Sequence, residues 1–139
     1  MLGWEDYVTS LLADGLCQDA AVFASSCPRL LAAKEEGLLE QMSPKEIRMI
    51  LSCDRKGFLV RGLTISGRKC YVIRDNFYMD GDDTMDIRMK RQEGTPCLSL
   101  AIARSKKVFI IIMGKQGIHG GTLNKKAFQM ATYIRKSGC

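Results

Sequence analysis

The chain has 139 residues, of which 46% are apolar and 26% are charged, and this ordinary mixture predicts one globular domain with a core of its own. No apolar run approaches the roughly 20 residues that span a bilayer, and the acidic residues near the N-terminus do not suit a signal peptide. Composition therefore argues against a membrane-spanning, secreted or disordered chain, and we expect a soluble protein of a reducing compartment.

The N-terminal segment predicts a helix followed by a pair of strands. Apolar residues recur at helical spacing over residues 3–13, where Trp4 and Tyr7 share one face. Residues 20–24 and 30–33 have the length and composition of short strands. Because the link between them is rich in turn-forming residues, we expect the two strands to pair antiparallel.

A second helix begins with a strong start signal. Ser43 suits the N-cap, Pro44 suits the first helical position, and Glu46 completes a capping box. Three apolar residues form its expected buried stripe: Ile47, Ile50 and Leu51. Further along, four segments have the pattern of short strands: residues 63–65, 70–73, 85–89 and 98–103.

The last third of the chain predicts a strand, a glycine loop and a closing helix. Residues 108–113 are apolar and mostly β-branched, which predicts a fully buried strand in the middle of a sheet. Glycines follow at positions 114, 117, 120 and 121, and then apolar residues recur at helical spacing: Leu123, Ala127, Met130, Ala131 and Ile134. Short turns between strands favour antiparallel neighbours, so the whole order predicts an α+β fold around an antiparallel sheet.

Charge is distributed unevenly along the chain. Residues 94–139 contain eight Lys or Arg and no Asp or Glu, whereas residues 1–93 contain thirteen cations and fifteen anions. The formal net charge of +6 therefore comes from the last third. This asymmetry indicates an acidic partner, which could be an acidic protein face, an anionic lipid surface or nucleic acid; a merely solvated basic surface is the alternative.

Motifs for catalysis or metal binding are weak. The glycine loop after residues 108–113 superficially resembles a phosphate-binding turn, but it matches neither GxxxxGK[ST] nor GxGxxG, and sharp backbone turning is a simpler role for the glycines. His119 is the only histidine, and no nucleophile motif accompanies it. Residues 80–83 with Asp86 suggest calcium, but Gly81 is misplaced for an EF-hand, so we predict a charged turn and no metal.

The six cysteines show no CxxC spacing, and a single histidine argues against a Cys/His zinc site. We predict that most of them are small core residues without disulfides. Cys139, at a chain end expected to fray, is predicted to be an exposed and oxidisable thiol.

Four stretches of the chain resemble animal profilins: ADGLCQDAAV at 13–22, GLTISGRKCYVIRD at 62–75, DGDDTMDIR at 80–88 and MGKQGIHGGTLNKKAFQMA at 113–131. The likeness extends over residues 1–139 as a single domain. It implies a central antiparallel sheet of six to seven strands, with the N- and C-terminal helices on one face and short helices on the other.

The resemblance implies a cytoplasmic protein of the cytoskeleton that is no enzyme and needs no cofactor. Such a protein binds monomeric actin, promotes nucleotide exchange on it and regulates filament assembly, as a monomer and without a nucleic-acid partner. The implied actin face comprises Val60, Lys69, Tyr71, Val72, Ile73, Arg74, Asp82, Arg88, Lys90, Cys97, Ser99, Ile118, His119, Gly121, Asn124, Lys125, Phe128 and Gln129.

Helical spacing supports part of this face independently. Lys125 and Phe128 are three residues apart, so a helix presents a cation and an aromatic ring together, as interface hot spots often do. The alternative is a buried Phe128 beside a solvated Lys125. Phe128 stands where the family often has an aromatic hydroxyl, Gln129 where it has a carboxylate and Tyr71 where it has a small residue, so we expect a shifted but retained actin affinity.

The resemblance also implies proline-rich segments of actin-assembly factors as partners, bound by Trp4, Tyr7, Leu31, Tyr133, Ile134 and Cys139. The family usually has a second Trp, a His and a C-terminal aromatic where this chain has Leu31, Tyr133 and Cys139, which predicts weakened binding. A phosphoinositide membrane surface is the third implied partner, and it would compete with actin through Lys69, Arg88, Lys90, Lys125, Arg135 and Lys136.

Two rival functions stay open at this point. One is a small phosphate-handling enzyme built on the glycine loop. The other is a peripheral phosphoinositide-binding scaffold with little actin activity.

Overall fold

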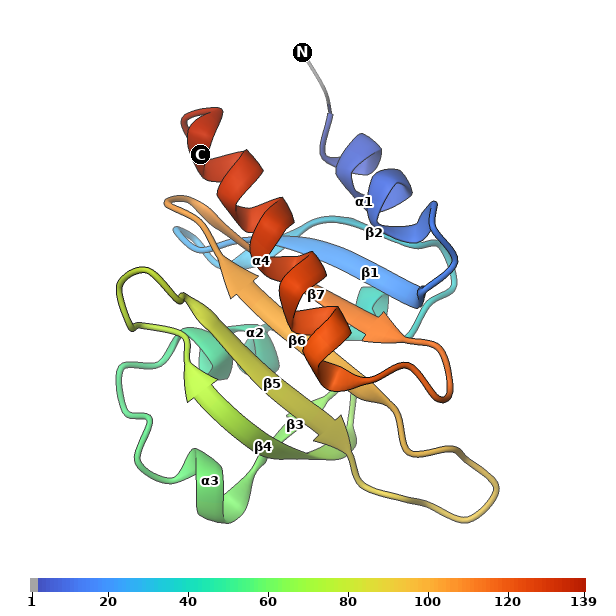
Figure 1. The fold of residues 1–139 in the computed structure, drawn as a ribbon. Coiled ribbons are helices and arrows are strands. Elements are labelled where there is room, and N and C mark those ends of the chain that lie inside the picture. The colour runs from blue at the N-terminus through green and yellow to red at the C-terminus, as the bar shows by residue number, and fades with distance from the viewer. Residues whose placement is uncertain (1–2) are drawn as a thin grey trace.

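The computed structural model describes residues 3–139, and its centre is a seven-stranded sheet in the order β2-β1-β7-β6-β5-β4-β3 (Figure 1). All neighbouring strands are antiparallel. The strands are β1 (Cys17–Ala24), β2 (Arg29–Ala33), β3 (Leu63–Ile65), β4 (Arg68–Asn76), β5 (Thr84–Met89), β6 (Ser99–Arg104) and β7 (Val108–Gly114). The α+β fold with a seven-stranded antiparallel sheet is therefore confirmed.

Strand β7 is buried along its whole length, as its apolar run predicts. It lies between β1 and β6, so both of its backbone edges are hydrogen-bonded within the sheet. Its side chains alternate between the two faces: Ile110 and Ile112 belong to one apolar cluster, and Phe109 and Ile111 belong to the other. On the second face Phe109 stacks on Phe23 of β1, with ring centroids 5.0 Å apart.

The two terminal helices, α1 (Trp4–Leu12) and α4 (Gly120–Lys136), cover one face of the sheet side by side (Figure 1). Helix α4 turns four apolar residues fully inward: Leu123, Ala127, Ala131 and Ile134. Met130, predicted to share this stripe, is only partly buried because it lies toward α1 at the border of the stripe. Among residues 3–139 no helix combines the length and the apolarity needed to cross a membrane.

Short helices cover the opposite face: the 3₁₀ helix η1 (Leu39–Gln41), α2 (Pro44–Leu51) and α3 (Phe58–Arg61). The predicted capping box begins α2, since Ser43 Oγ accepts a hydrogen bond from Glu46 N at 3.1 Å and Glu46 Oε1 accepts one from Ser43 N at 2.9 Å. Ile47 and Ile50 are buried as predicted, whereas Leu51, in the last turn, is only half-buried. Helix α3 was not predicted because four residues carry no detectable period.

The prediction that most cysteines lie in the core is wrong. Only Cys17 and Cys70 are buried, and burial raises the pKa of their thiols to about 11 and about 12. The four others are exposed or half-buried: Cys27, Cys53, Cys97 and Cys139. Turns and the chain end, where three of these four lie, have too few neighbours to bury a small side chain.

The chain end at Cys139 is held in place instead of frayed. Its backbone carbonyl accepts hydrogen bonds from Ser105 Oγ at 2.9 Å and from Lys107 N at 2.5 Å. Because Cys139 is half-buried and packs against the apolar cluster under α1 and α4, the predicted exposed thiol is corrected to a partly covered one.

Candidate functional site

Strand β4 divides its side chains between an outer surface and the core. Lys69, Tyr71 and Ile73 point outward, whereas Cys70 and Val72 point inward. Val72 was predicted to belong to the actin face, but only 6% of it is exposed and it packs in the core cluster. The prediction that Val72 contacts actin through its side chain is therefore corrected, because that side chain packs in the core.

The outer surface over β4, β5 and the start of α4 exposes large apolar side chains among cations. Val60 of α3 is 88% exposed, and Tyr71 and Ile73 are also exposed. Tyr71 lies opposite Arg88 of β5, and the Lys90 ammonium lies 4.6 Å from the centroid of the Tyr71 ring. An exposed aromatic ring between two cations favours contact with an acidic, partly apolar surface.

Helix α4 adds its first turns to this outer surface. Lys125 is exposed and Phe128 is 39% exposed, so the alternative of a buried Phe128 is wrong. Gln129 is exposed as well. The cation and the aromatic ring three residues apart are therefore both available to a partner.

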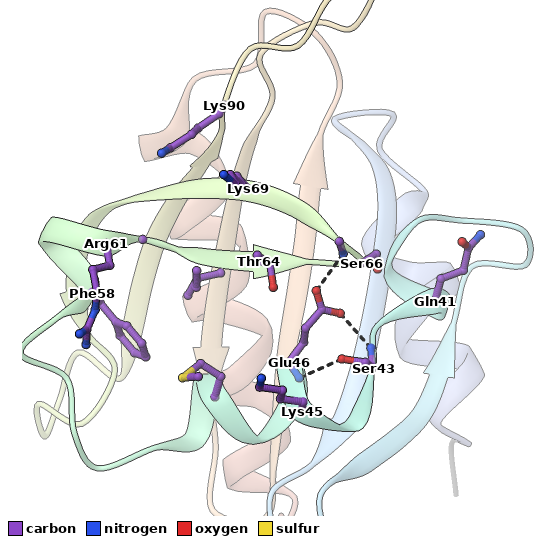
Figure 2. A pocket seen from close by; sticks show the side chains of 14 residues that line it. Gln41, Ser43, Lys45, Glu46, Phe58, Arg61, Thr64, Ser66, Lys69 and Lys90 are labelled. Carbon is purple, nitrogen blue, oxygen red and sulfur yellow. Dashed lines mark hydrogen bonds between the residues drawn. The ribbon is translucent and has the colours of Figure 1, made fainter.

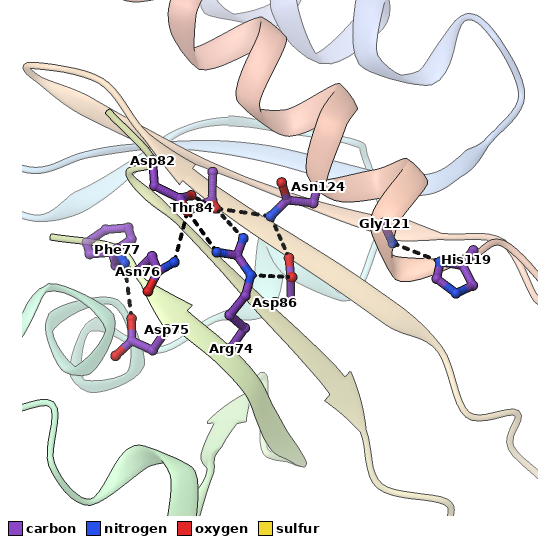
Figure 3. A network of polar contacts seen from close by, with 10 residues as sticks. All are labelled: Arg74, Asp75, Asn76, Phe77, Asp82, Thr84, Asp86, His119, Gly121 and Asn124. Carbon is purple, nitrogen blue, oxygen red and sulfur yellow. Dashed lines mark hydrogen bonds and ion pairs between the residues drawn. The ribbon is translucent and has the colours of Figure 1, made fainter. Parts of the chain in front are cut away.

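A polar network fastens α4 to β4 and β5 beneath this surface (Figure 3). The Arg74 guanidinium forms ion pairs with Asp82 at 2.8 Å and with Asp86 at 3.1 Å. Asn124 of α4 donates from Nδ2 to Asp86 Oδ1 at 2.7 Å and to Thr84 Oγ1 at 3.0 Å. These bonds orient the helix turn that carries the exposed ring and cation.

The polar network keeps the Asp82 carboxyl and the Arg74 guanidinium charged. Burial works against ionisation of this carboxyl, but hydrogen bonds from Thr84, Asn76 and Arg74 outweigh burial and lower the pKa of Asp82 below its ordinary value. The same pairs outweigh desolvation at Arg74 and raise the pKa of its guanidinium. Arg74 and Asp82 thus act within the surface as a fixed ion pair.

The turn between β7 and α4 closes one side of a cleft of about 450 Å³ on the same surface. Its lining includes seven residues of the implied actin face: Ile73, Arg88, Cys97, Ser99, Ile118, His119 and Gly121. His119 is the N-cap of α4, because its Nδ1 accepts a hydrogen bond from Gly121 N at 3.1 Å (Figure 3). The structure therefore places the histidine at this cleft as the N-cap of α4.

Three aromatic rings line the edge of the terminal helices. The Trp4 and Tyr7 ring centroids are 5.5 Å apart, and Tyr7 meets Tyr133 of α4 edge to face at 6.2 Å. Leu31 and Cys139 are partly buried and pack against the same apolar cluster as Trp4 and Tyr7. Four of the six residues implied for proline-rich ligands, Trp4, Tyr7, Leu31 and Cys139, therefore border one cluster, and Tyr133 meets that group through Tyr7.

Ile134 is the exception in this group. Only 1% of it is exposed, because it belongs to the inward stripe of α4. The implied contact role of Ile134 is therefore corrected, because its side chain lies in the core beneath this edge.

The six cations implied for phosphoinositides do not form one cluster. Lys69 and Lys90 line a cavity of about 720 Å³ beside α2 and α3, together with Arg61 and Lys45 (Figure 2). Lys125 and Arg135 lie ten residues apart on α4, which corresponds to about 15 Å along the helix. Lys69 and Lys90 therefore lie together at the cavity, Arg135 and Lys136 lie at the end of α4, and Lys125 lies apart from that end in the first turns of the helix.

Sequence reasoning missed two members of these surfaces. Arg61 lines the cavity in Figure 2, and Leu59 is an exposed apolar residue next to Val60. Both lie on α3. The sequence shows an apolar pair followed by a cation there, but four residues are too few to reveal a helical period.

Two of the three aspartates in the charged turn at residues 80–83, Asp82 and Asp83, form ion pairs. Asp83 contacts Arg104 at 2.9 Å and Arg135 at 3.3 Å, so it ties α4 to the sheet. Within residues 3–139 no group of three or more His, Cys, Asp or Glu side chains is arranged to hold a metal ion.

Comparisons with known proteins agree with this architecture. The family model for profilin matches residues 2–139. Profilin-2 of Homo sapiens is 48% identical over 139 residues, which cover 99% of both chains, and Profilin-1 of Mus musculus is 41% identical over 138 residues with the same coverage. The structure of mouse profilin IIa in complex with a double repeat from the FH1 domain of mDia1 has a TM-score of 0.95 and 47% identity, covering 99% of this chain and 100% of that one.

Proposed function

Because the chain belongs to the profilin family, we propose that it binds monomeric actin, promotes nucleotide exchange on it and regulates filament assembly in the cytoplasm. The observation that carries this proposal is the mixture of exposed apolar side chains and cations on the outer surface of β4, β5 and α4. Exposed Tyr71, Ile73 and Phe128 lie there among the cations Lys69, Lys90 and Lys125. Such a surface complements a partner that is acidic and partly apolar.

The proposed role is binding without chemistry of its own. The one histidine caps α4, and the carboxyl of Asp82 is held in an ion pair. A binding protein accelerates nucleotide exchange when it binds more tightly to the actin conformation that releases nucleotide. Rigid placement of α4 on the sheet suits that role, since a rigid surface discriminates between two partner conformations better than a mobile one.

Release of a fluorescent nucleotide from actin monomers tests the proposal. We expect the release rate to rise with protein concentration and to saturate. Tight actin binding with an unchanged release rate would overturn the exchange activity alone. Absence of actin binding by a folded protein would overturn the proposal as a whole.

We also propose that the aromatic edge formed by Trp4, Tyr7 and Tyr133 binds proline-rich segments. Support comes from the tilted and edge-to-face rings and from the similar mouse profilin IIa, whose structure is a complex with a double repeat from an FH1 domain. Polyproline II helices dock on such ring surfaces. Leu31 offers no flat face, so the affinity should be lower than that of a profilin with a tryptophan there.

A third candidate partner is a phosphoinositide surface, favoured by the cations around the cavity in Figure 2. Lys69 and Lys90 line that cavity and also border the proposed actin surface, so lipid and actin should compete. Binding of the protein to vesicles with and without phosphoinositide, measured at low and high salt, tests the proposed lipid contact. Vesicle binding by a protein that fails to bind actin would favour the alternative of a membrane scaffold.

A further inference from the structure

A pocket of about 360 Å³ lies between α1 and α4 and continues the aromatic edge toward the first half of α4. Tyr7 and Leu11 line it from α1, and Met130 and Tyr133 line it from α4. Tyr7 and Tyr133 are also the rings that meet edge to face in the proposed proline groove. The pocket is therefore continuous with that groove, and a ligand lying on the rings would reach it with its next residue.

Two of the described residues that line the pocket are charged, and they are Asp6 and Lys126. Asp6 of α1 is exposed at the pocket, and its Oδ2 accepts a hydrogen bond from Gly3 N at 2.9 Å. Lys126 also lines the pocket, but its ammonium lies 2.6 Å from Asp14 Oδ2. Because this ion pair offsets the lysine charge, the Asp6 carboxylate dominates the local field.

We propose that this pocket takes the side chain of an arginine or lysine that directly flanks the proline run of a proline-rich ligand. A cation is attracted by tyrosine rings and by a carboxylate, and Tyr7, Tyr133 and Asp6 all line the pocket. The aliphatic stem of such a side chain would pack on Leu11 and Met130. The inference rests on the proposed proline groove and adds to it a preference for basic flanking residues.

The geometry of the ligand fits this proposal. A polyproline II helix advances about 3.1 Å per residue, so a residue adjacent to the prolines on the rings lies within side-chain reach of the continuing pocket. This chain lacks a tryptophan at Leu31, and a contact beyond the rings would restore part of the affinity that the missing ring removes.

Titrations with end-blocked peptides test the proposal. The peptides are a plain proline decamer, the decamer with arginine at one end or the other, and the decamer with glutamate at the same ends. Fluorescence of Trp4, the only tryptophan of the chain, reports binding. We expect one arginine-flanked peptide to bind about tenfold more tightly than the plain decamer, with an advantage that shrinks as salt rises, and the glutamate-flanked peptides to bind no better.

Two variants locate the effect. Asp6→Asn keeps an oxygen that can accept from Gly3 N but removes the charge, and it should reduce the arginine advantage to near one. Glu5→Gln removes the same charge from the same helix turn at an exposed residue outside the pocket, so it should retain the advantage.

The outcomes separate this inference from the groove proposal. Binding of the plain decamer without any arginine advantage overturns the inference alone, as does an advantage lost equally in both variants. Failure of every peptide to bind overturns the proline groove and this inference together.

Discussion

Asn124 on the first turns of α4 donates to Asp86 on β5 at 2.7 Å, although the two residues lie 38 positions apart in the sequence. Asp86 also pairs with Arg74 on β4, so one carboxylate joins the helix to two strands. The exposed Lys125 is the next residue along α4. This bond therefore sets where the helix presents its cation to a partner.

Removing that bond should affect both stability and binding. We expect Asn124→Ala to lower the free energy of unfolding by about 1 to 3 kcal/mol, because the partly buried hydrogen bonds to Asp86 and Thr84 are both lost. Actin affinity should fall as well, since α4 is less firmly placed. Urea unfolding and a fluorescent-actin titration measure the two effects. Thr122→Ala, at an exposed position in the same helix turn, serves as the control for the helix itself.

Charge reversal on the proposed actin surface should be costly. We expect Lys125→Glu to weaken actin binding by about 2 to 3 kcal/mol, because it opposes the complementary charge of the partner. Lys136→Glu makes the same change at an exposed site about 16 Å further along α4 and should have little effect on actin. Equal dissociation constants for the two folded variants in a fluorescent-actin titration would contradict the placement of the surface.

Restoring a ring in the proline groove should strengthen ligand binding. We expect Leu31→Trp to raise the affinity for a proline decamer by about 1 to 3 kcal/mol, which is roughly tenfold to more than a hundredfold. Calorimetric titration is the suitable measurement, because the new tryptophan would complicate fluorescence. Leu59→Trp adds an exposed tryptophan on α3, outside the groove, and should gain nothing. An unchanged affinity in Leu31→Trp would show that Leu31 does not border the bound ligand.

The capping carboxylate of α2 should make stability depend on pH. Burial raises the pKa of Glu46, but hydrogen bonds from Gly67 and Ser43 outweigh burial and lower that pKa below its ordinary value. A depressed folded-state pKa means that the contribution is complete above the unfolded value and is lost as pH falls through the folded value. We therefore expect Glu46→Gln to be less stable than the parent at about pH 7 and to approach it at about pH 3.

Urea unfolding of the parent and the variant at several pH values checks this expectation. Glu35→Gln changes the same kind of charge at an exposed position and should follow the parent throughout. A constant difference between Glu46→Gln and the parent across that range would contradict the linkage.

Most secondary structure could be predicted from the sequence because it depends on local patterns. The capping box at Ser43 and Glu46 satisfies backbone groups within one helix turn, so four consecutive residues are enough to recognise it in the sequence. The buried strand β7 is equally plain, since a β-branched run of strand length has few alternatives. The resemblance to profilins predicted the antiparallel sheet and the helices on each of its faces. The observed seven-stranded antiparallel sheet confirms the predicted sheet.

Tertiary structure alone decided which way side chains face and which distant groups meet. Val72 and Ile134 belong to implied binding sets, yet strand alternation and the inward stripe of α4 bury both. In the pocket between α1 and α4, the charge of Lys126 is offset by its pairing with Asp14, 112 positions away. No local pattern encodes that pairing, because it arises only when the two terminal helices pack side by side and the ion pair leaves Asp6 as the dominant charge.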